Sequence, residues 1–249
     1  MKWILAFDAS TPRCAIALGR VDAERHELVV ADDEDEVENQ ASVRLFPRIK
    51  AALKRAGVES SELSAVACGR GPGTFTGTRV AVASAKGLAY GLGCPVLPVS
   101  TLGAVAASAG HEGSVLAITD ARRREVYGGL WRCAGLDRDA TPTVEAVGDE
   151  RVIGLRALLE QMAPLPEDLR VVGSGVAPYR EVLVEAGLGE RTQALPGPSA
   201  RGLWAITATA WAADRACHPA ALEAVYLRAS YAEMGLNTPK RPFVKSPFV

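Results

Sequence analysis

Two aspartates stand where short apolar runs end, and both could take part in phosphate or magnesium chemistry. Asp8 ends the run 2–8 and is followed by Ser10 and Thr11, while Asp120 follows the run 114–119. A carboxylate beside hydroxyl groups, in a turn between two strands, can hold Mg²⁺ and the phosphates of a nucleotide. Each match is only a few residues long, so an ordinary turn is the preferred interpretation of each one taken alone.

Glycine-rich loops follow two other predicted strands. Residues 69–79 read GRGPGTFTGTR, and residues 172–175 read VGSG. Glycines between a strand and a helix can turn backbone N–H groups toward an anion, and Gly173 and Gly175 could face an adenosine. The longer loop has no lysine for a Walker A sequence, and Thr74 breaks the GxGxxG pattern. A tight loop that lets two elements pack closely is the favoured alternative.

The helix predicted after the longer loop, over residues 76–91, is rich in small side chains. Ala81, Ala85 and Ala89 share one stripe at a spacing of four. Gly87 and Gly91 each cost about 1 kcal/mol of helix propensity relative to alanine, and close packing would offset that loss. The stripe therefore indicates either burial against the chain's own sheet or a helix–helix interface with another subunit.

Groups for nucleophilic or metal chemistry are scattered. The three histidines have no HxxxH or HExxH spacing, and no GxSxG elbow is present. The five cysteines form no CxxC pair, which is typical of small buried residues in a reducing compartment. Arg122, Arg123 and Arg124 form a basic cluster that we interpret as solvated surface, with a phosphate or partner contact as the alternative.

The composition indicates a globular protein without a strongly basic surface. The chain has 249 residues, of which 48% are hydrophobic, and a formal net charge of -1. This length suits one large domain or two small ones. Tight binding of nucleic acid usually needs a positive excess, so in a tRNA reaction another protein should hold most of the tRNA. An early acid at Asp8 and the absence of an apolar run of roughly 18 residues predict a cytoplasmic protein without membrane contact.

The elements expected in the first half form an antiparallel meander and then a crossover. The predicted strands are 2–8, 14–18, 26–31, 63–68 and 95–99, and the predicted helices are 45–56, 76–91 and 102–109. The acidic run at 32–38 suits a loop or a sheet edge. The first helix either begins near Phe46 or kinks there, because Pro47 is tolerated mainly in a first turn. The last two strands are expected to be parallel.

The second half repeats this order more faintly. The predicted strands are 114–119, 126–133, 144–147 and 170–172, and the predicted helices are 155–162, 178–186 and 199–217, with Ser199 as the N-cap of the last. Because each half begins with a strand that ends in aspartate, we expect an internal duplication. The predicted lobes are residues 1–103 and 104–236, with the last long helix packing back on the first lobe. Residues 237–249 read as a flexible basic tail.

Five segments, in this order and spacing, resemble the bacterial TsaB (YeaZ) family. They are ILAFDASTPRCAIAL at 4–18, GRGPGTFTGTRVAVASAKGLAYGLGCPVLPVSTL at 69–102, DARRREVY at 120–127, VGSG at 172–175 and VYLR at 225–228. The second segment is long and unusual, so the resemblance is specific. It implies an α/β fold of the actin-like, Hsp70-like (ASKHA) type, with two duplicated lobes of mixed sheets flanked by helices and a degenerate nucleotide site.

The same resemblance implies a non-catalytic activating subunit of the complex that makes threonylcarbamoyladenosine (t6A) on tRNA. It would bind TsaD, which carries the metal and the transfer chemistry, and support transfer to the adenosine next to the anticodon of ANN-decoding tRNAs. The other implied partners are the ATPase TsaE, a donor-forming enzyme and tRNA through the complex, and the chain alone would form a homodimer. The complex would use ATP, whereas this chain would require no cofactor or metal, and nucleotide binding in its cleft stays open.

By this resemblance, the surface that binds TsaD lies on the helices around 45–56 and 76–91. Its predicted residues are Leu45, Ile49, Phe75, Thr76, Arg79, Val80, Ala81, Ser84, Ala85, Gly87 and Leu88. The sequence departs from the family at Ala41, where many relatives have histidine, at Arg124, where glycine is frequent, at Ala224, where proline is frequent, and in GTFTGTR for GSFTGVR. The missing histidine weakens a metal role for this chain.

Two other functions stay open at this level. An ATP-dependent small-molecule kinase of the same fold would use Asp8 and Asp120 to position magnesium and ATP. A protease, the older superfamily label, ranks last, because no nucleophile–base pair or metal set can be assembled from the sequence.

Overall fold

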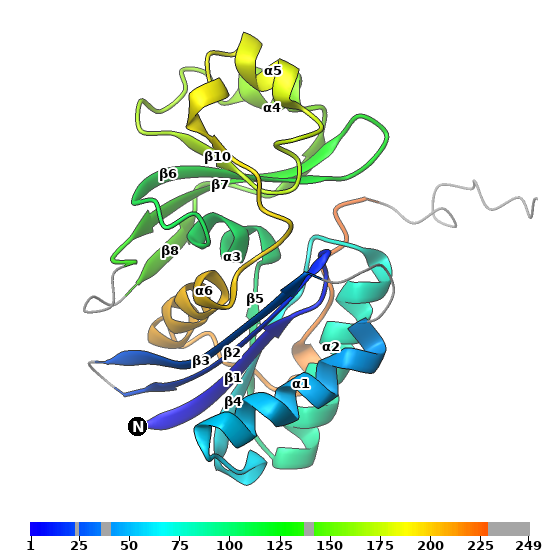
Figure 1. Ribbon diagram of the computed structural model, residues 1–249, viewed down its shortest axis with the longest axis vertical. Coiled ribbons are helices and arrows are strands. Elements are labelled where there is room, and N and C mark those ends of the chain that lie inside the picture. The colour runs from blue at the N-terminus through cyan, green and yellow to red at the C-terminus, as the bar shows by residue number, and fades with distance from the viewer. Residues whose placement is uncertain (23–24, 36–40, 137–141, 229–249) are drawn as a thin grey trace, which may run out of the picture.

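The computed structural model describes residues 1–22, 25–35, 41–136 and 142–228, which form two β-sheets with helices between and outside them (Figure 1). Each sheet with its outer helices makes one lobe, and the two lobes lie at opposite ends of the long axis in this view. None of the helices in these ranges is both long and apolar enough to cross a membrane.

The first sheet has the strand order β3-β2-β1-β4-β5. Its strands are β1 (Lys2–Asp8), β2 (Arg13–Val21), β3 (His26–Asp35), β4 (Leu63–Gly69) and β5 (Val96–Val99). β1 is antiparallel to β2 and parallel to β4, and β4 is parallel to β5, as the crossover predicted. The associated helices are α1 (Ala41–Ala56), η1 (Ser60–Glu62), α2 (Phe75–Leu92) and α3 (Thr101–Ala107).

The second sheet has the order β11-β10-β6-β7-β8, and β9 also pairs with β7. Its strands are β6 (Gly113–Asp120), β7 (Val126–Ala134), β8 (Thr143–Ala146), β9 (Arg151–Ile153), β10 (Arg170–Val172) and β11 (Thr192–Gln193). Its helices are α4 (Leu155–Gln161), α5 (Arg180–Glu185), η2 (Gly189–Arg191), α6 (Ala200–Ala212) and η3 (Pro219–Ala221).

The two lobes repeat one topology. An antiparallel meander of three strands leads through a helix to two parallel strands in both lobes, and a helix follows the last strand. The two closing helices, α3 and α6, even begin alike: the hydroxyl of Ser100 accepts from the N–H of Gly103, and that of Ser199 accepts from the N–H of Gly202. The predicted duplicated, two-lobed ASKHA fold is confirmed, as is the N-cap at Ser199.

Three apolar clusters hold the layers together. Alternating residues of β1 point to opposite faces, so Ile4 and Ala6 join the central cluster and Leu5 and Phe7 join the outer one. The central cluster includes α3 and α6 between the sheets (Figure 1), α1 and α2 cover the outer face of the first sheet, and α4 and α5 cover the second. This burial on both faces explains why β1 and β4 read as continuous apolar runs.

Two predicted helix boundaries are wrong. α1 begins at Ala41 and continues through Pro47, because the carbonyl freed by the missing proline N–H belongs to Val43, on the exposed side of the helix. α6 ends at Ala212 rather than at residue 217. Asp214 has a φ of 51°, which breaks the helix, and Cys217 instead forms a β-bridge with Val96.

Other boundaries also need correction. The strand predicted to end at residue 31 continues to Asp35 as β3, which is the edge strand of the first sheet. Of the two predictions for the acidic run, the sheet edge is therefore confirmed as far as Asp35. The predicted lobe boundary after residue 103 falls inside α3, which packs whole between the sheets. The short strands β9 and β11 were not predicted, since two or three residues carry too little periodicity. The predicted tail, 237–249, lies outside the described residues.

Candidate functional site

The turn after β1 is buried, and its aspartate is hydrogen-bonded inside the protein. Oδ1 of Asp8 accepts hydrogen bonds from the backbone N–H and the hydroxyl of Ser10, both at 2.7 Å. Oδ2 of Asp8 accepts from the hydroxyl of Thr101 at 2.6 Å. The exposed fraction of Asp8 and of Ser10 is 0%. Burial raises the pKa of the Asp8 carboxyl, and the hydrogen bonds from Thr101 and Ser10 oppose that rise.

The glycine loop packs directly on this turn. A Cβ atom on Gly69 would lie 1.9 Å from Oδ2 of Asp8, and one on Gly73 would lie 2.3 Å from the Ser10 carbonyl oxygen. A Cβ atom on Gly77 would lie 2.1 Å from the carbonyl oxygen of Ala9. Because no side chain fits at these separations, the three glycines serve close approach of the loop to the turn. The backbone of Gly69 therefore lies directly against the Asp8 carboxylate.

Thr11 is covered from another direction. Its hydroxyl donates a hydrogen bond to the carbonyl oxygen of Arg13 at 2.8 Å. A Cβ atom on Gly197, just before α6, would lie 2.0 Å from Oγ1 of Thr11. The structure therefore brings Asp8, Ser10 and Thr11 together, but beneath the loop and the segment before α6.

The equivalent turn in the second lobe is open. The side chain of Asp120 is 23% exposed, and its Oδ1 atom accepts from the backbone N–H of Arg122 at 2.8 Å. The VGSG loop packs closely on the end of β6, as the glycine loop packs on the Asp8 turn, because glycine leaves room for the neighbouring backbone. A Cβ atom on Gly173 would lie 2.2 Å from the Ile118 carbonyl oxygen, and the N–H of Gly175 donates to that oxygen at 3.0 Å. Gly173 and Gly175 thus have a packing role that needs no adenosine.

The segment after α6, which we call the C-terminal strap (residues 213–228), joins the two lobes. The N–H of Val225 donates to the carbonyl oxygen of Arg70 in the glycine loop at 2.8 Å. Farther on, the Arg228 guanidinium pairs with Glu125 in the second lobe. The VYLR segment could be picked out in the sequence, but its clamping role depends on contacts with residues more than a hundred positions away.

Burial divides the predicted interface residues of α1 and α2 into two groups. Leu45, Ile49, Ala81 and Ala85 are at most 3% exposed and belong to the chain's own core, so their assignment to a partner surface is wrong. These side chains lie on the helix faces turned toward the first sheet. The remaining predicted residues are exposed or half-buried: Phe75, Thr76, Arg79, Val80, Ser84, Gly87 and Leu88.

Two glycines on this surface have no packing partner among the described residues. A Cβ atom on Gly87 or on Gly91 would meet nothing within 4 Å. Contacts within the part of the chain that the structure describes therefore do not offset the expected helix penalty of about 1 kcal/mol at each position. The alanine stripe is explained by the chain's own sheet, whereas the two glycines are not.

Exposed aromatic side chains lie at the N-terminal end of α2. Phe75 is 51% exposed, and its ring lies 5.5 Å from that of Tyr226 in the strap. The Arg79 guanidinium lies 3.8 Å from the centroid of the Phe75 ring and donates a hydrogen bond to the hydroxyl of Tyr226 at 3.1 Å. Exposed aromatic and arginine side chains of this kind are enriched at the centres of protein interfaces.

The basic side of α1 has internal partners. Arg48 pairs with Asp32 at 2.9 Å and Arg44 pairs with Glu34 at 2.8 Å, both on β3. Asp33, between these two acids, accepts from the backbone N–H of Ala200 at the start of α6. Because successive side chains of a strand point to opposite faces, Asp32 and Glu34 contact α1 while Asp33 contacts the start of α6.

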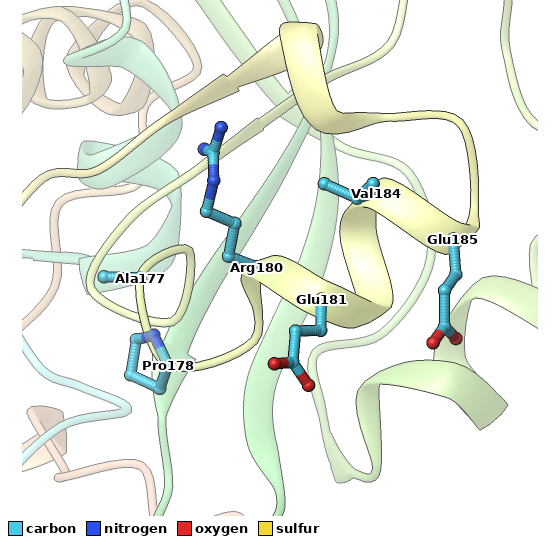
Figure 2. A pocket seen from close by; sticks show the side chains of 6 residues that line it. All are labelled: Ala177, Pro178, Arg180, Glu181, Val184 and Glu185. Atoms are coloured by element: carbon cyan, nitrogen blue, oxygen red, sulfur yellow. The ribbon is translucent and has the colours of Figure 1, made fainter.

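The described residues offer no second group of side chains suited to nucleophilic or metal chemistry. The described residues hold no cluster of three or more His, Cys, Asp or Glu side chains suited to a metal. All five cysteines are free, and burial raises the pKa of Cys68 well above its usual range and that of Cys133 to about 11. An open depression on α5 is lined by Ala177, Pro178, Arg180, Glu181, Val184 and Glu185. Figure 2 shows Arg180 pointing away from the two glutamates, so its charged groups do not converge.

Comparison with known proteins gives matches over most of the chain. Residues 21–216 match the family model described as TsaD, tRNA N6-adenosine threonylcarbamoyltransferase. The chain is 32% identical to the tRNA threonylcarbamoyladenosine biosynthesis protein TsaB of Escherichia coli, over 90% of this chain and 94% of that protein. This chain belongs to the TsaB (YeaZ) family. The resemblance seen in the sequence is confirmed.

Further relatives agree with membership of the TsaB family. A Pseudomonas aeruginosa protein, described as similar to peptidase YEAZ, has a crystal structure that matches with 32% identity and a TM-score of 0.73, covering 92% of this chain and 100% of that one. A second structure, YeaZ from the same organism, matches with 29% identity and a TM-score of 0.70, over 90% and 100%. An uncharacterized Mycobacterium tuberculosis protein is 40% identical over 59% of this chain and 66% of its own length.

Proposed function

We propose that this chain is an accessory subunit in the biosynthesis of t6A on tRNA, and that it activates TsaD by binding it. The names of its relatives in Escherichia coli, Haemophilus influenzae and Bacillus subtilis support a role in t6A biosynthesis. Activation of this kind needs a subunit that binds the competent state of its partner more tightly than the inactive state.

The non-catalytic part of the proposal is carried by the buried turn at Asp8. Both carboxylate oxygens are occupied by hydrogen bonds from Ser10 and Thr101, and Gly69 packs against them. A carboxylate that binds Mg²⁺ with a nucleotide must reach water and phosphate oxygens. Here the loop would first have to move away from the turn.

The binding part of the proposal is supported by the exposed surface of α2. Gly87 and Gly91 leave open space on a helix, where a partner helix can approach closely. Phe75 and Tyr226, both contacted by Arg79, add apolar area at one end of that surface. We call the exposed residues of α2 together with Tyr226 the α2 surface, and we propose that TsaD binds there.

Family membership supports the remaining parts of the proposal. TsaE, the donor-forming enzyme and ATP act in the assembled complex, and this chain itself uses no cofactor. The modified adenosine lies next to the anticodon of ANN-decoding tRNAs, and the reaction takes place in the cytoplasm. Without TsaD, the α2 surface pairs with that of a second copy of the chain.

A bulky residue at Gly87 tests the α2 surface. Gly87→Trp should abolish binding to purified TsaD, measured by size-exclusion chromatography and calorimetry, because the new ring occupies the space for the partner helix. The fold should persist, since no atom of the described residues, apart from the adjacent residues and backbone of α2 itself, lies within 4 Å of a Cβ at this position. Val184→Trp, at an exposed position of α5 on the other lobe, is the matched control and should bind normally. Normal binding by Gly87→Trp would rule out this surface.

The kinase alternative makes a different prediction. It requires magnesium-dependent ATP binding by the isolated chain that is lost in Asp8→Ala. We expect calorimetry to detect no such Asp8-dependent binding, because Asp8 is enclosed by Gly69 and Ser10.

A further inference from the structure

The turn between β6 and β7 holds three consecutive arginines in a left-handed backbone conformation. Arg122, Arg123 and Arg124 have φ angles of 63°, 55° and 63°. The left-handed helical conformation costs roughly 1–2 kcal/mol for each residue that carries a side chain, and glycine would avoid this cost. Backbone strain of this kind is concentrated at functional sites. We call residues 122–124 the arginine turn.

Contacts on both sides hold the arginine turn in place. The N–H of Glu125, the residue that follows the turn, donates to the carbonyl oxygen of Arg122 at 3.0 Å. From the strap, the Arg228 guanidinium donates to the carbonyl oxygen of Ala121 at 2.6 Å and pairs with Glu125. From the residue before α5, the Tyr179 hydroxyl donates to the carbonyl oxygen of Glu125 at 3.0 Å. The guanidinium groups therefore project from a fixed backbone.

The arginine turn is exposed and carries a net positive charge. All three of its residues are exposed, and the Arg122 side chain is 82% exposed. Asp120 lies 3.5 Å from the Arg122 guanidinium, and Glu125 pairs with Arg228. Among the contacts of the described residues, four arginines (Arg122, Arg123, Arg124 and Arg228) lie with the carboxylates of Asp120 and Glu125 at this end of the second lobe.

We infer that the arginine turn binds the phosphate backbone of RNA while the complex holds its tRNA, an inference that rests on the proposed function. Guanidinium groups bind phosphate oxygens through paired hydrogen bonds. Small phosphorylated ligands are usually enclosed in concave sites, whereas this turn projects from the end of a hairpin. Because the whole chain has a formal net charge of -1, the turn adds to binding by the complex rather than holding RNA alone.

Replacement of the three arginines by asparagine tests the inference. Asparagine is among the residues that tolerate positive φ, so the variant Arg122→Asn/Arg123→Asn/Arg124→Asn keeps the backbone and removes the charge. The control is Arg151→Asn/Arg156→Asn/Arg191→Asn, which removes the same charge from three other exposed positions of the second lobe. Fluorescence anisotropy with labelled tRNA, at salt concentrations from about 50 to 200 mM, measures binding by the assembled complex.

The arginine-turn variant should weaken tRNA binding at least about tenfold at low salt and lower the slope of log K against log salt by about 2 to 3. The control should stay within about twofold of wild type. The inference would be overturned if both variants lost the same tRNA affinity, or if the arginine-turn variant kept the wild-type affinity. It would also be overturned if the arginine-turn variant failed to assemble with the other proteins but lost no tRNA affinity. If omission of the whole chain leaves t6A formation unchanged, the proposed function fails and the inference fails with it. If the chain is required but the variant binds tRNA normally, only the inference fails.

Discussion

The same change, glycine to alanine, should have opposite effects at two positions of this protein. At Gly69 the new Cβ atom would lie 1.9 Å from Oδ2 and 2.4 Å from Cγ of the buried Asp8 side chain. Overpacking of this kind costs about 1–3 kcal/mol, and a displaced Asp8 loses hydrogen bonds worth about 1 kcal/mol each. The free energy of unfolding should therefore fall by roughly 2–5 kcal/mol.

At Gly87 the new methyl group meets nothing within 4 Å, in the interior of α2. Alanine should raise the free energy of unfolding by about 1 kcal/mol, through helix propensity alone. Thermal denaturation should then show a Tm lower by roughly 10 °C for Gly69→Ala and higher by about 2–4 °C for Gly87→Ala.

Both measurements use the isolated chain in buffer without nucleotide. Under these conditions a loop that serves mainly to bind phosphate should tolerate an added methyl group. A wild-type Tm for Gly69→Ala would therefore refute the conclusion that the glycine loop packs on the Asp8 turn. A lower Tm for Gly87→Ala would show that the exposed side of α2 is not open within the chain.

Three further predictions concern the buried turn, the arginine turn and α2. Burial raises the folded-state pKa of Asp8 above 3.8, so the wild-type protein loses stability as the pH rises through that pKa. Asp8→Asn should therefore be increasingly more stable than wild type in urea denaturation from about pH 4 to pH 8, and parallel pH profiles of the two proteins would contradict this. Arg124→Gly should raise the free energy of unfolding by about 1 kcal/mol, whereas the control Lys50→Gly, on the exposed side of α1, should lower it by a similar amount. A lower free energy of unfolding in both variants would show that Arg124 is unstrained. Ala85→Leu should lower the free energy of unfolding by about 1–3 kcal/mol, because Ala85 is fully buried. An unchanged urea midpoint would contradict the burial of Ala85 in the core.

Most of the fold could be predicted because local patterns and the family resemblance agreed. The strands β1, β4 and β6 read clearly as apolar runs that end in turn residues. The helix start at Ala41 was missed because the proline rule is local, while the stability of α1 comes from packing on the sheet and from ion pairs such as Arg48 with Asp32.

The candidate site was predicted less well, because its contacts join distant parts of the chain. Asp8 and Ser10 stood out in the sequence, but nothing there indicated that Thr101 donates to Asp8 or that Gly197 covers Thr11. The alanine stripe on α2 fitted either a core or an interface, since small residues permit close packing against any neighbour. Only the burial of Ala85 separated these alternatives.

The most direct test of the proposed function is an omission assay. Purified TsaD, TsaE, the donor-forming enzyme, tRNA, threonine, bicarbonate and ATP are combined with and without this chain, and t6A is quantified. We predict that t6A formation collapses without the chain and is restored by the wild type and by Asp8→Asn, but not by Gly87→Trp. Equal t6A formation with and without the chain would contradict its role as the activating subunit.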